Sequence, residues 1–354
     1  MCMKIIHVIA NMEIGGAQRL LADLLPIQAR TNDVTLLLLK NVDNQFTRRI
    51  VSSGVKLLSV DIKYYYNPFN AIALNEHTRG FDIIHVHLTP AVYGMAIASL
   101  FSKKNMILTE HSTSGRLRSK YYMRPIERFV YSRYNKIISI SDQTQEALVA
   151  WIGSGHLEKH VVIPNGIDLS AFKCVPLSNN RNIIMVSRFA ASKDQNTVIK
   201  ALNLLPEDIK LAFVGDGPTI DESKKLVAEL KLDNRVDFLG FRSDISDIIP
   251  LYYIGVQSSH WEGFGLSAVE IMASGRPVVA SDVEGLKQVV DGAGLLFESG
   301  NEVDLANKIM RLLEDKVYYT DVAGKCQKRA SQYDIHNMAK EYEMIYNKVV
   351  SQNG

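Results

Sequence analysis

The chain has 354 residues, of which 47% are hydrophobic and 22% charged, and its formal net charge is +2. This composition excludes an intrinsically disordered chain, and the length favours two domains over a single core. The three cysteines show no C-x-x-C spacing, which argues against a disulfide framework or a thiolate metal site and fits a cytoplasmic protein. Charge is unevenly divided, because residues 1–170 hold 19 basic and 13 acidic side chains whereas residues 171–354 hold 21 and 25.

The N-terminal residues predict a strand and not a targeting segment. The apolar run Ile5 to Ala10 is too short for the core of a signal peptide. Elsewhere no apolar stretch approaches the length of a membrane-spanning helix.

Short β-branched apolar runs alternate with amphipathic segments along the chain, a rhythm typical of βαβ units. In the first half the expected strands are 4–10, 34–39, 55–60, 82–87, 105–109 and 136–141. The rhythm restarts after a polar stretch, with expected strands 182–187, 210–214, 235–239, 254–257 and 277–280 and expected helices 194–203 and 219–230. The sequence therefore predicts an α/β protein with two doubly wound parallel sheets.

Residues 176–182 have the composition of a linker, and the tail from about 302 to 350 is helical in pattern. We expect one Rossmann-like domain over residues 1–172, a second over 173–332, and a C-terminal helix over 333–354. There is no solenoid repeat and no low-complexity tract.

The most informative stretch runs from Ser258 to Pro277 and predicts a strand, a glycine-flanked turn and a helix that opens near Gly265. In an open α/β sheet ligands bind at the carboxyl edge, and the free N–H groups of a helix N-terminus favour an anion such as a diphosphate. Glu262 sits in the turn, and Glu270 follows in the second turn of the helix. Ordinary solvated glutamates in a strand-turn-helix unit are the alternative interpretation.

Arg188 and Lys193 follow another predicted strand and place two cations at its carboxyl edge. Together they could neutralise a diphosphate, or they could be solvated loop residues. Gly15 and Gly16 follow the first strand, where they permit close approach of a ligand or simply form a tight turn. None of these loops has the G-x-G-x-x-G pattern of dinucleotide-cofactor proteins.

The run E-G-F-G-L-x-x-x-E from Glu262 to Glu270 resembles the signature of the family-4 retaining glycosyltransferases. The resemblance implies a GT-B fold, in which two facing Rossmann-like domains flank a cleft, the first binding the acceptor and the second the nucleotide-sugar donor. It also implies that the C-terminal helix 333–354 packs back on the first domain. It implies that Glu262 contacts donor-sugar hydroxyls, Glu270 the ribose, and Arg188 and Lys193 the leaving diphosphate. It further implies donor contacts from a wider set of residues: Gly15, Gly16, Phe241, Arg242, Gly263, Phe264, Gly265 and Leu266.

Three histidines lie near two strand ends, and His85 and His87 face the same side of one strand. A metal site would need a third ligand, and none follows at suitable spacing. We therefore interpret His85 and His87 as a packed pair. His111 matches a family position that faces the reacting sugar and acceptor, and the resemblance makes it a candidate catalytic residue. In the loop 239–244, Asp244 is also a candidate N-cap.

Seven basic residues lie between Arg116 and Lys136 against one acid, Glu127, with five interleaved aromatic residues. This pattern suits an anionic membrane surface or a phosphate-bearing acceptor, and it equally suits a helix whose aromatic side chains face the core. Tyr64, Tyr65, Tyr66 and Phe69 form a second aromatic loop in the same half. The near-neutral chain shows no nucleic-acid-binding motif.

We therefore expect a retaining, metal-independent glycosyltransferase that uses a nucleoside-diphosphate sugar, UDP being favoured, and needs no cofactor. A lipid-linked or cell-surface glycan precursor is the expected acceptor, reached by a cytoplasmic enzyme at the inner face of the membrane. The alternatives are a nucleotide-sugar 2-epimerase and a non-catalytic nucleotide-sugar-binding protein. A dehydrogenase and an exported solute-binding protein are disfavoured by the missing fingerprint and the missing export signal.

Overall fold

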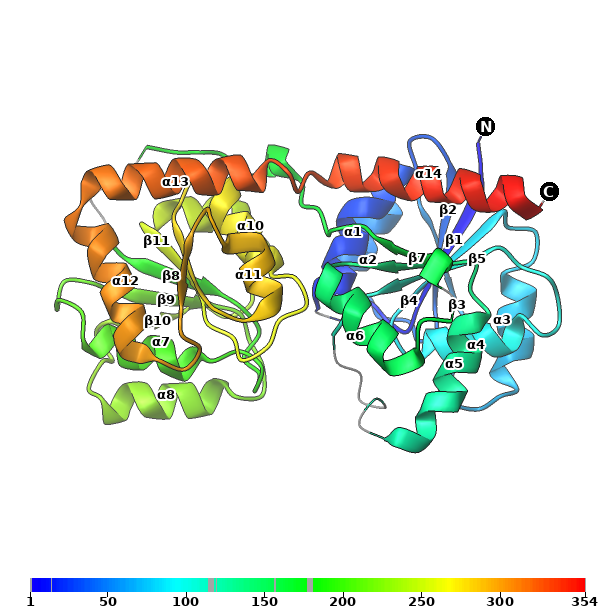
Figure 1. Cartoon of the computed structure of the whole chain (residues 1–354), viewed down its shortest axis with the longest axis horizontal. Coiled ribbons are helices and arrows are strands. Elements are labelled where there is room, and N and C mark those ends of the chain that lie inside the picture. The colour runs from blue at the N-terminus through cyan, green and yellow to red at the C-terminus, as the bar shows by residue number, and fades with distance from the viewer. Residues whose placement is uncertain are drawn as a thin grey trace. The chain divides into compact units, whose positions relative to one another are not determined.

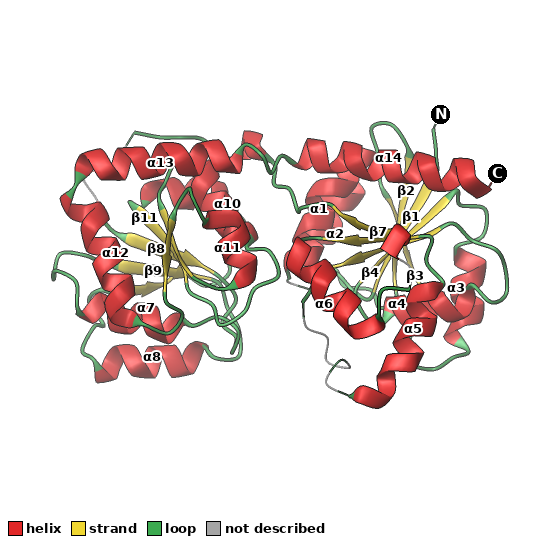
Figure 2. Cartoon of the chain, in the orientation of Figure 1, coloured by secondary structure: helices red, strands yellow, loops and turns green. Residues whose placement is uncertain are grey.

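The computed structural model describes residues 2–13, 15–113, 118, 120–155, 157–176 and 181–353. The chain forms two compact units: unit 1 comprises residues 1–166 and 335–354, and unit 2 comprises residues 167–334. The expected linker 176–182 lies largely outside the described residues. In each unit a sheet is covered by helices on both faces (Figure 2).

Unit 1 contains a parallel sheet of seven strands among the described residues, in the order β3-β2-β1-β4-β5-β6-β7. The strands are β1 Lys4–Ile9, β2 Asp33–Leu38, β3 Lys56–Ser59, β4 Ile83–His87, β5 Met106–Glu110, β6 Lys136–Ser139 and β7 His160–Val162. Its helices are α1 Gly16–Gln28, α2 Gln45–Ser52, α3 Asn70–His77, α4 Ala91–Ala98, α5 Arg124–Ser132, α6 Asp142–Ile152 and α14 Ile335–Asn353, with 3₁₀ turns η1 Tyr121–Met123 and η2 Leu157–Lys159. The chain order reverses between β1 and β4, which makes that pair the switch point of the sheet.

The two faces of this sheet pack against different helices, because successive side chains of a strand point to opposite faces. Ile5 and Ile9 of β1 pack in a cluster with α1 and α14, whereas Ile6 and Val8 pack with α3, α4 and α5. The continuous apolar run of β1 is thus explained by burial on both faces.

Helix α14 supplies one side of that core although it is the last element of the chain. It lies along unit 1 beside α1 (Figure 1) and buries Tyr342 and Tyr346 completely. Glu343 of the same helix accepts hydrogen bonds of 2.9 Å from Thr31 and Asn32, just after α1. The C-terminal helix is therefore an integral part of the first unit.

Unit 2 repeats the architecture with six parallel strands among its described residues, in the order β10-β9-β8-β11-β12-β13. The strands are β8 Ile183–Val186, β9 Leu211–Val214, β10 Val236–Phe238, β11 Ile254–Gln257, β12 Val278–Ser281 and β13 Leu295–Phe297. Its helices are α7 Gln195–Asn203, α8 Ile220–Glu229, α9 Ile245–Ile248, α10 Leu266–Ala273, α11 Glu284–Val290, α12 Glu302–Glu314 and α13 Lys316–Ala330, with 3₁₀ turns η3 Leu169–Ala171 and η4 Ile249–Leu251. Here the switch point lies between β8 and β11.

The structure confirms the α/β class and the two parallel sheets, and it adds two short edge strands that the periodicity does not predict. β7 and β13 are three residues long and lie at the outer edges of the two sheets. Both pair with a neighbouring strand whose position is strongly patterned, which is what fixes them as strands.

Replacing Tyr346 by alanine should lower the free energy of unfolding of unit 1 by about 3–5 kcal/mol, because a large ring is removed from a close-packed core. The two tryptophans lie in different units, so in a Trp261→Phe background the fluorescence of Trp151 reports on unit 1 alone. Met344→Ala is the matched control on the same helix, since Met344 is 63% exposed. An equal loss in both variants would contradict the assigned burial.

Candidate functional site

The loops after β8 and β11 meet at the switch point of unit 2. Lys193 forms an antiparallel bridge with Ser259, and the Asp194 amide donates to the Ser258 carbonyl over 3.1 Å. The His260 amide also donates to the Ser192 carbonyl over 2.9 Å. These backbone hydrogen bonds hold the two loops together, so residues 69 positions apart in sequence can place their side chains in contact.

Lys193 and Glu262 form an ion pair there, with each side chain only 19% exposed. The other carboxylate oxygen of Glu262 accepts a 3.1 Å hydrogen bond from the Gly263 amide. The resemblance implies separate roles for these two side chains, whereas the structure shows that each neutralises the other. Arg188, at the end of β8, is exposed.

Helix α10 begins directly after this turn because Gly265 adopts a left-handed conformation, with φ of +92°, that glycine adopts without strain. A Cβ atom on Gly285 would lie 2.2 Å from the Glu262 carbonyl oxygen, so only glycine allows α11 to approach the turn this closely. The first N–H groups of α10 have no partner within the helix and form a local concentration of donors. The site thus combines a helix N-terminus, a cation and a carboxylate.

Glu270 and Phe264 are buried in unit 2. Glu270 lies in α10 and is 1% exposed. Phe264 is buried behind the turn and packs edge-on against Tyr333, with ring centroids 5.3 Å apart. The Phe264 side chain therefore anchors the turn, and only its backbone remains for the ligand contact that the resemblance implies.

The loop after β10 differs from expectation at Asp244. Asp244 occupies the N-cap position of α9, but its side chain makes no capping hydrogen bond, so the N-cap prediction is wrong in that respect. Its carboxylate instead accepts a 2.8 Å hydrogen bond from Arg242, and this exposed pair lowers the pKa of Asp244. The Arg242 guanidinium is thus already engaged by a neighbour, and the adjacent Phe241 ring is partly exposed.

The glycine pair of unit 1 lies at the N-terminus of α1, after β1. Gly15 has an extended backbone that any residue can adopt, and a Cβ atom on Gly16 would meet open space. The local fold therefore does not require glycine at position 16.

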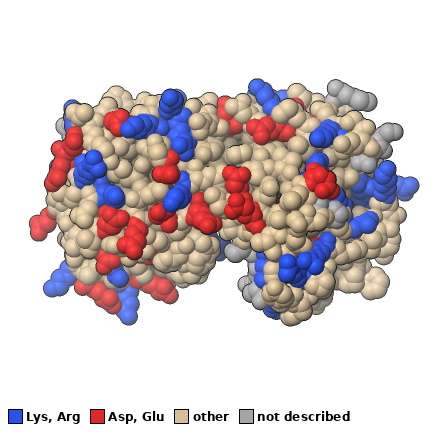
Figure 3. Space-filling view, viewed as in Figure 1, with Lys and Arg blue, Asp and Glu red and all other residues tan. Residues whose placement is uncertain are grey.

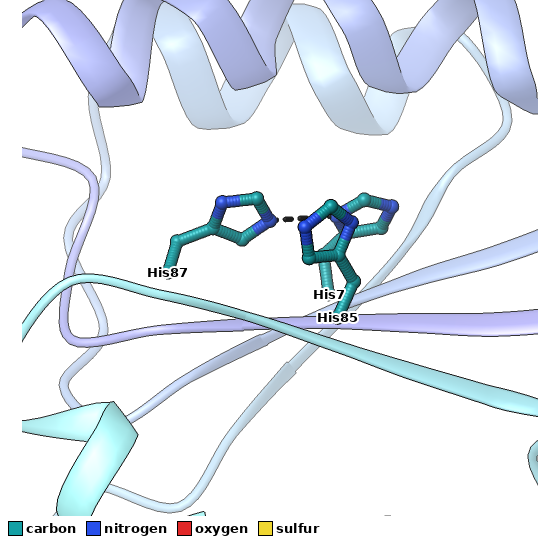
Figure 4. A group of neighbouring side chains, drawn as sticks. All are labelled: His7, His85 and His87. Carbon is teal, nitrogen blue, oxygen red and sulfur yellow. Dashed lines mark hydrogen bonds between the residues drawn. The ribbon is translucent and has the colours of Figure 1, made fainter. Parts of the chain in front are cut away.

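Four histidines gather on the α1 and α14 face of the first sheet, beside its switch point. His7 lies on β1, His85 and His87 on β4, and His111 just after β5. Figure 4 shows three of these rings side by side, with a 3.0 Å contact between His7 Nδ1 and His87 Nε2. His87 Nδ1 lies 3.1 Å from His111 Nε2. The expected packed pair is therefore part of a larger hydrogen-bonded cluster.

His7 is the member that sequence reasoning missed. His7 lies two residues after Ile5 in β1, so the two side chains point to the same face of the sheet. Parallel pairing of β1 with β4 places His7 opposite His85. A histidine inside a buried apolar strand is an available signal, because a buried imidazole needs a hydrogen-bond partner.

Burial lowers the pKa of all four imidazoles, since the charged form is disfavoured away from water. The pKa of His7 falls to about 3 and that of His111 to about 4. Burial, and then the neighbouring rings, hold the pKa values of His85 and His87 well below the usual 6.5. All four rings are neutral at physiological pH.

The basic segment is largely bonded to its own unit; Arg116 lies outside the described residues. The Arg118 side chain is only 11% exposed, and it donates to Glu110 over 2.7 Å and to Tyr131 over 3.0 Å. Arg124 and Arg128 donate to the last carbonyl groups of α6, Trp151 O at 2.6 Å and Ile152 O at 2.7 Å. Figure 3 shows Lys and Arg side chains gathered over the part of unit 1 that contains α5 and α6.

The aromatic residues of the same segment divide into two groups. Tyr131 and Tyr134 are buried in the core, as the alternative interpretation expects. Tyr121, Tyr122 and Phe129 are exposed, Tyr121 by 76%. No helix of the described residues is long and apolar enough to cross a membrane.

Two family models together cover most of the chain. The model described as Glycosyltransferase Family 4 matches residues 14–171, and that described as Glycosyl transferases group 1 matches residues 171–333. Among curated proteins, N-acetylgalactosamine-N,N'-diacetylbacillosaminyl-diphospho-undecaprenol 4-alpha-N-acetylgalactosaminyltransferase of Campylobacter jejuni is 26% identical over 94% of this chain and 96% of its own. The poly(glycerol-phosphate) alpha-glucosyltransferase of Bacillus subtilis is 28% identical over 66% of this chain, a match that spans 36% of that relative.

Among solved structures, the Anabaena protein HepE in complex with UDP-glucose superposes with a TM-score of 0.88 at 24% identity, covering 98% of this chain and 100% of its own. Sucrose-phosphate synthase of Thermosynechococcus elongatus superposes with a TM-score of 0.82 at 19% identity, covering 98% and 99%. Fold and site thus define a glycosyltransferase with two Rossmann-like domains. The chain belongs to the family-4 glycosyltransferases of GT-B fold.

Unit 1 should lose stability as the pH falls from 7 to 5. The folded pKa values of the four histidines lie below the unfolded value, so between these values the unfolded chain binds more protons. The stability is present above pH 6.5 and is lost below it, by about 2 kcal/mol for each histidine that stays neutral at pH 5. Urea unfolding followed through Trp151 at both pH values measures the loss.

The variant His7→Gln should show a shallower pH dependence, because one buried imidazole is absent. His260→Gln is the matched control, since His260 is exposed in unit 2. A wild-type stability that does not change between pH 7 and pH 5 would contradict neutral burial of the cluster.

Proposed function

We propose that the chain transfers a sugar from a nucleoside-diphosphate sugar to an acceptor hydroxyl with retention of anomeric configuration and without a metal ion. The observation that carries the proposal is the contact of Lys193 and Glu262 beside the N-terminus of α10, at the switch point of a parallel sheet. This is the edge at which open α/β sheets bind ligands. The relatives' names support donors of this chemical class, since they include a UDP-Gal and a GDP-mannose transferase.

The chemistry of transfer demands that negative charge on the departing diphosphate be stabilised as it develops. In the proposed scheme the N–H groups of α10, Lys193 and the exposed Arg188 provide that stabilisation. The ion pair then opens when the donor binds, because the diphosphate competes with Glu262 for Lys193. Glu262 is released to accept hydrogen bonds from sugar hydroxyls, and the buried Glu270 serves the ribose.

UDP is the nucleotide that we favour, and a lipid-linked glycan precursor is the acceptor. Several relatives are named for acceptors on diphospho-undecaprenol, among them the Campylobacter and Escherichia coli enzymes. A thermal-shift panel of UDP, GDP and ADP identifies the nucleotide, with Glu270→Ala as the variant that should lose the response. Chelating agents should leave transfer intact, and release of free sugar without an acceptor would favour an epimerase.

The variant Glu262→Gln should lower turnover by about a hundredfold or more, because a preorganised contact to the reacting sugar is lost at nearly constant volume. Nucleoside diphosphate affinity, measured by calorimetry, should change little. Glu284→Gln is the control, since Glu284 is a nearby exposed carboxylate. Transfer is measured from the selected nucleotide sugar to a polyprenyl-diphosphate-linked N-acetylhexosamine. Unchanged turnover would refute the role of Glu262.

We also propose that the exposed rings near η1 and α5 bring the enzyme to anionic membranes. Because Arg118 and Arg124 are bonded within the unit, the exposed aromatic residues are the better target for mutation. The triple serine variant of Tyr121, Tyr122 and Phe129 should sediment less with vesicles containing anionic lipid, since amphipathic aromatic rings favour the interface. The control replaces three exposed apolar residues of unit 2, Leu251, Val303 and Val317, by serine. Equal sedimentation of both variants would exclude this docking surface.

A further inference from the structure

The histidine cluster continues beyond the imidazoles into a network that joins α1, β1, β4, β5 and α14. The Gln28 side-chain oxygen lies 2.8 Å from His7 Nε2, and its amide nitrogen donates to the Tyr346 hydroxyl over 3.2 Å. The Tyr346 hydroxyl lies 2.6 Å from His85 Nδ1. Gln28, His7, His87 and Tyr346 are all buried, so their hydrogen bonds are not exchanged for bonds to bulk water.

The geometry favours a hydrogen-bonded network over a metal centre. Ligand atoms of His7, His85 and His87 lie within 4.8 Å of one another, close enough to consider a shared ion. However, the two nitrogens of His85 contact the Tyr346 and Thr109 hydroxyls at 2.6 and 2.7 Å, and both nitrogens of His7 have partners of their own. A metal ion would have to break several of these buried contacts.

The direction of each hydrogen bond follows from the amide of Gln28. A neutral imidazole carries one N–H, and the burial that lowers the histidine pKa values keeps each ring neutral. The Gln28 carbonyl oxygen can only accept, so His7 carries its proton on Nε2 and offers Nδ1 as an acceptor. His87 must then donate from Nε2 to His7, and its own Nδ1 accepts from His111 Nε2.

The second branch is consistent with the same direction. Tyr346 accepts from the Gln28 amide and therefore donates to His85 Nδ1, which leaves the proton of His85 on Nε2, facing Thr109. All four histidines are then Nε2–H tautomers, the form that a histidine side chain prefers in water. Rotation of the Gln28 amide by half a turn would reverse every donor and place all four rings in the less favoured tautomer.

We infer that Gln28 is a positioning residue that fixes the tautomer of His111 through His7 and His87. His111 consequently presents an unprotonated Nδ1, which accepts a hydrogen bond from a substrate hydroxyl. The second part rests on the proposed function, because it takes the hydroxyl from the sugar or from the acceptor. The first part concerns the protein alone and can be measured without any substrate.

The direct test is the side-chain ¹⁵N spectrum of the histidine-labelled enzyme at pH 7.5, with resonances assigned by single substitutions. We expect His7, His87 and His111 to show a protonated Nε2 and an unprotonated Nδ1. A protonated Nδ1 on His111 would overturn the inference whether or not the enzyme transfers sugar. A change in the ¹⁵N shifts of His7, His85 and His87 on addition of Zn²⁺ would also overturn the inference, in favour of a metal centre.

The variant Gln28→Met removes the terminal acceptor at similar side-chain length. We expect a mixture of His111 tautomers and a fall in kcat of about tenfold, the equivalent of one hydrogen bond, with donor KM within twofold of wild type. Tyr134→Phe is the matched control, since it removes a buried 2.7 Å hydrogen bond to Val92 in unit 1 without touching the network. It should keep both the spectrum and kcat.

The outcomes separate the two proposals. If Gln28→Met leaves the His111 spectrum and kcat unchanged, Gln28 does not set the tautomer. If kcat falls equally in both variants and both spectra stay normal, the loss is one of packing and the inference fails. If the wild-type enzyme transfers no sugar from any nucleotide sugar, the proposed function fails, while the wild-type spectrum still decides the tautomer of His111.

Discussion

Each unit of this protein depends on one constraint: a parallel sheet must be buried on both faces. In unit 1, helices α3, α4 and α5 cover one face of the sheet. On the opposite face α1 is joined by α14, which packs beside it and completes the cover. Because α14 lies over strands that carry polar imidazoles, it must also satisfy them, and its Tyr342 and Tyr346 lie within hydrogen-bonding distance of Thr109 and His85. The last helix of the chain is thus a hydrogen-bonding partner as well as a cover for the first sheet.

The same sheet topology explains where chemically useful residues gather. At the switch point of unit 2, the loops after β8 and β11 diverge to opposite faces, yet their backbones stay hydrogen-bonded near Ser258 and Ser259. This arrangement brings a lysine from one loop to a glutamate of the other, in front of the helix that Gly265 starts. In unit 1 the corresponding point, between β1 and β4, carries the histidine cluster. The same architecture therefore holds charged side chains at the switch point of unit 2 and neutral polar side chains at that of unit 1.

Two partly buried groups of ionic side chains are stabilised by pairing of opposite charges. Lys193 neutralises Glu262, which allows both to lie at a partly buried site without an uncompensated charge. Arg118 likewise contacts Glu110, Glu127 and Tyr131. The basic segment 116–136, whose sequence suggests a charged surface, is therefore partly an internal network of hydrogen bonds and ion pairs. In contrast, the imidazoles avoid the cost of buried charge by staying neutral. A neutral ring has one donor and one acceptor nitrogen, whereas a charged ring has two donors, so only the neutral ring gives its hydrogen bonds a direction.

The sequence by itself determined the α/β class, most strand positions and the family signature, because these are local: apolar runs, turn residues and the spacing of Glu262 and Glu270 are all read along the chain. Tertiary structure alone decided which of these residues touch. The ion pair of Lys193 with Glu262, the ion pairs of Arg118 and the histidine network all join residues from separate elements, and no periodicity encodes such contacts. His7 shows the difference most clearly. Its position in a buried strand is visible in the sequence, but its partners His87 and Gln28 are set by parallel pairing of β1 with β4 and by the packing of α1 on the sheet.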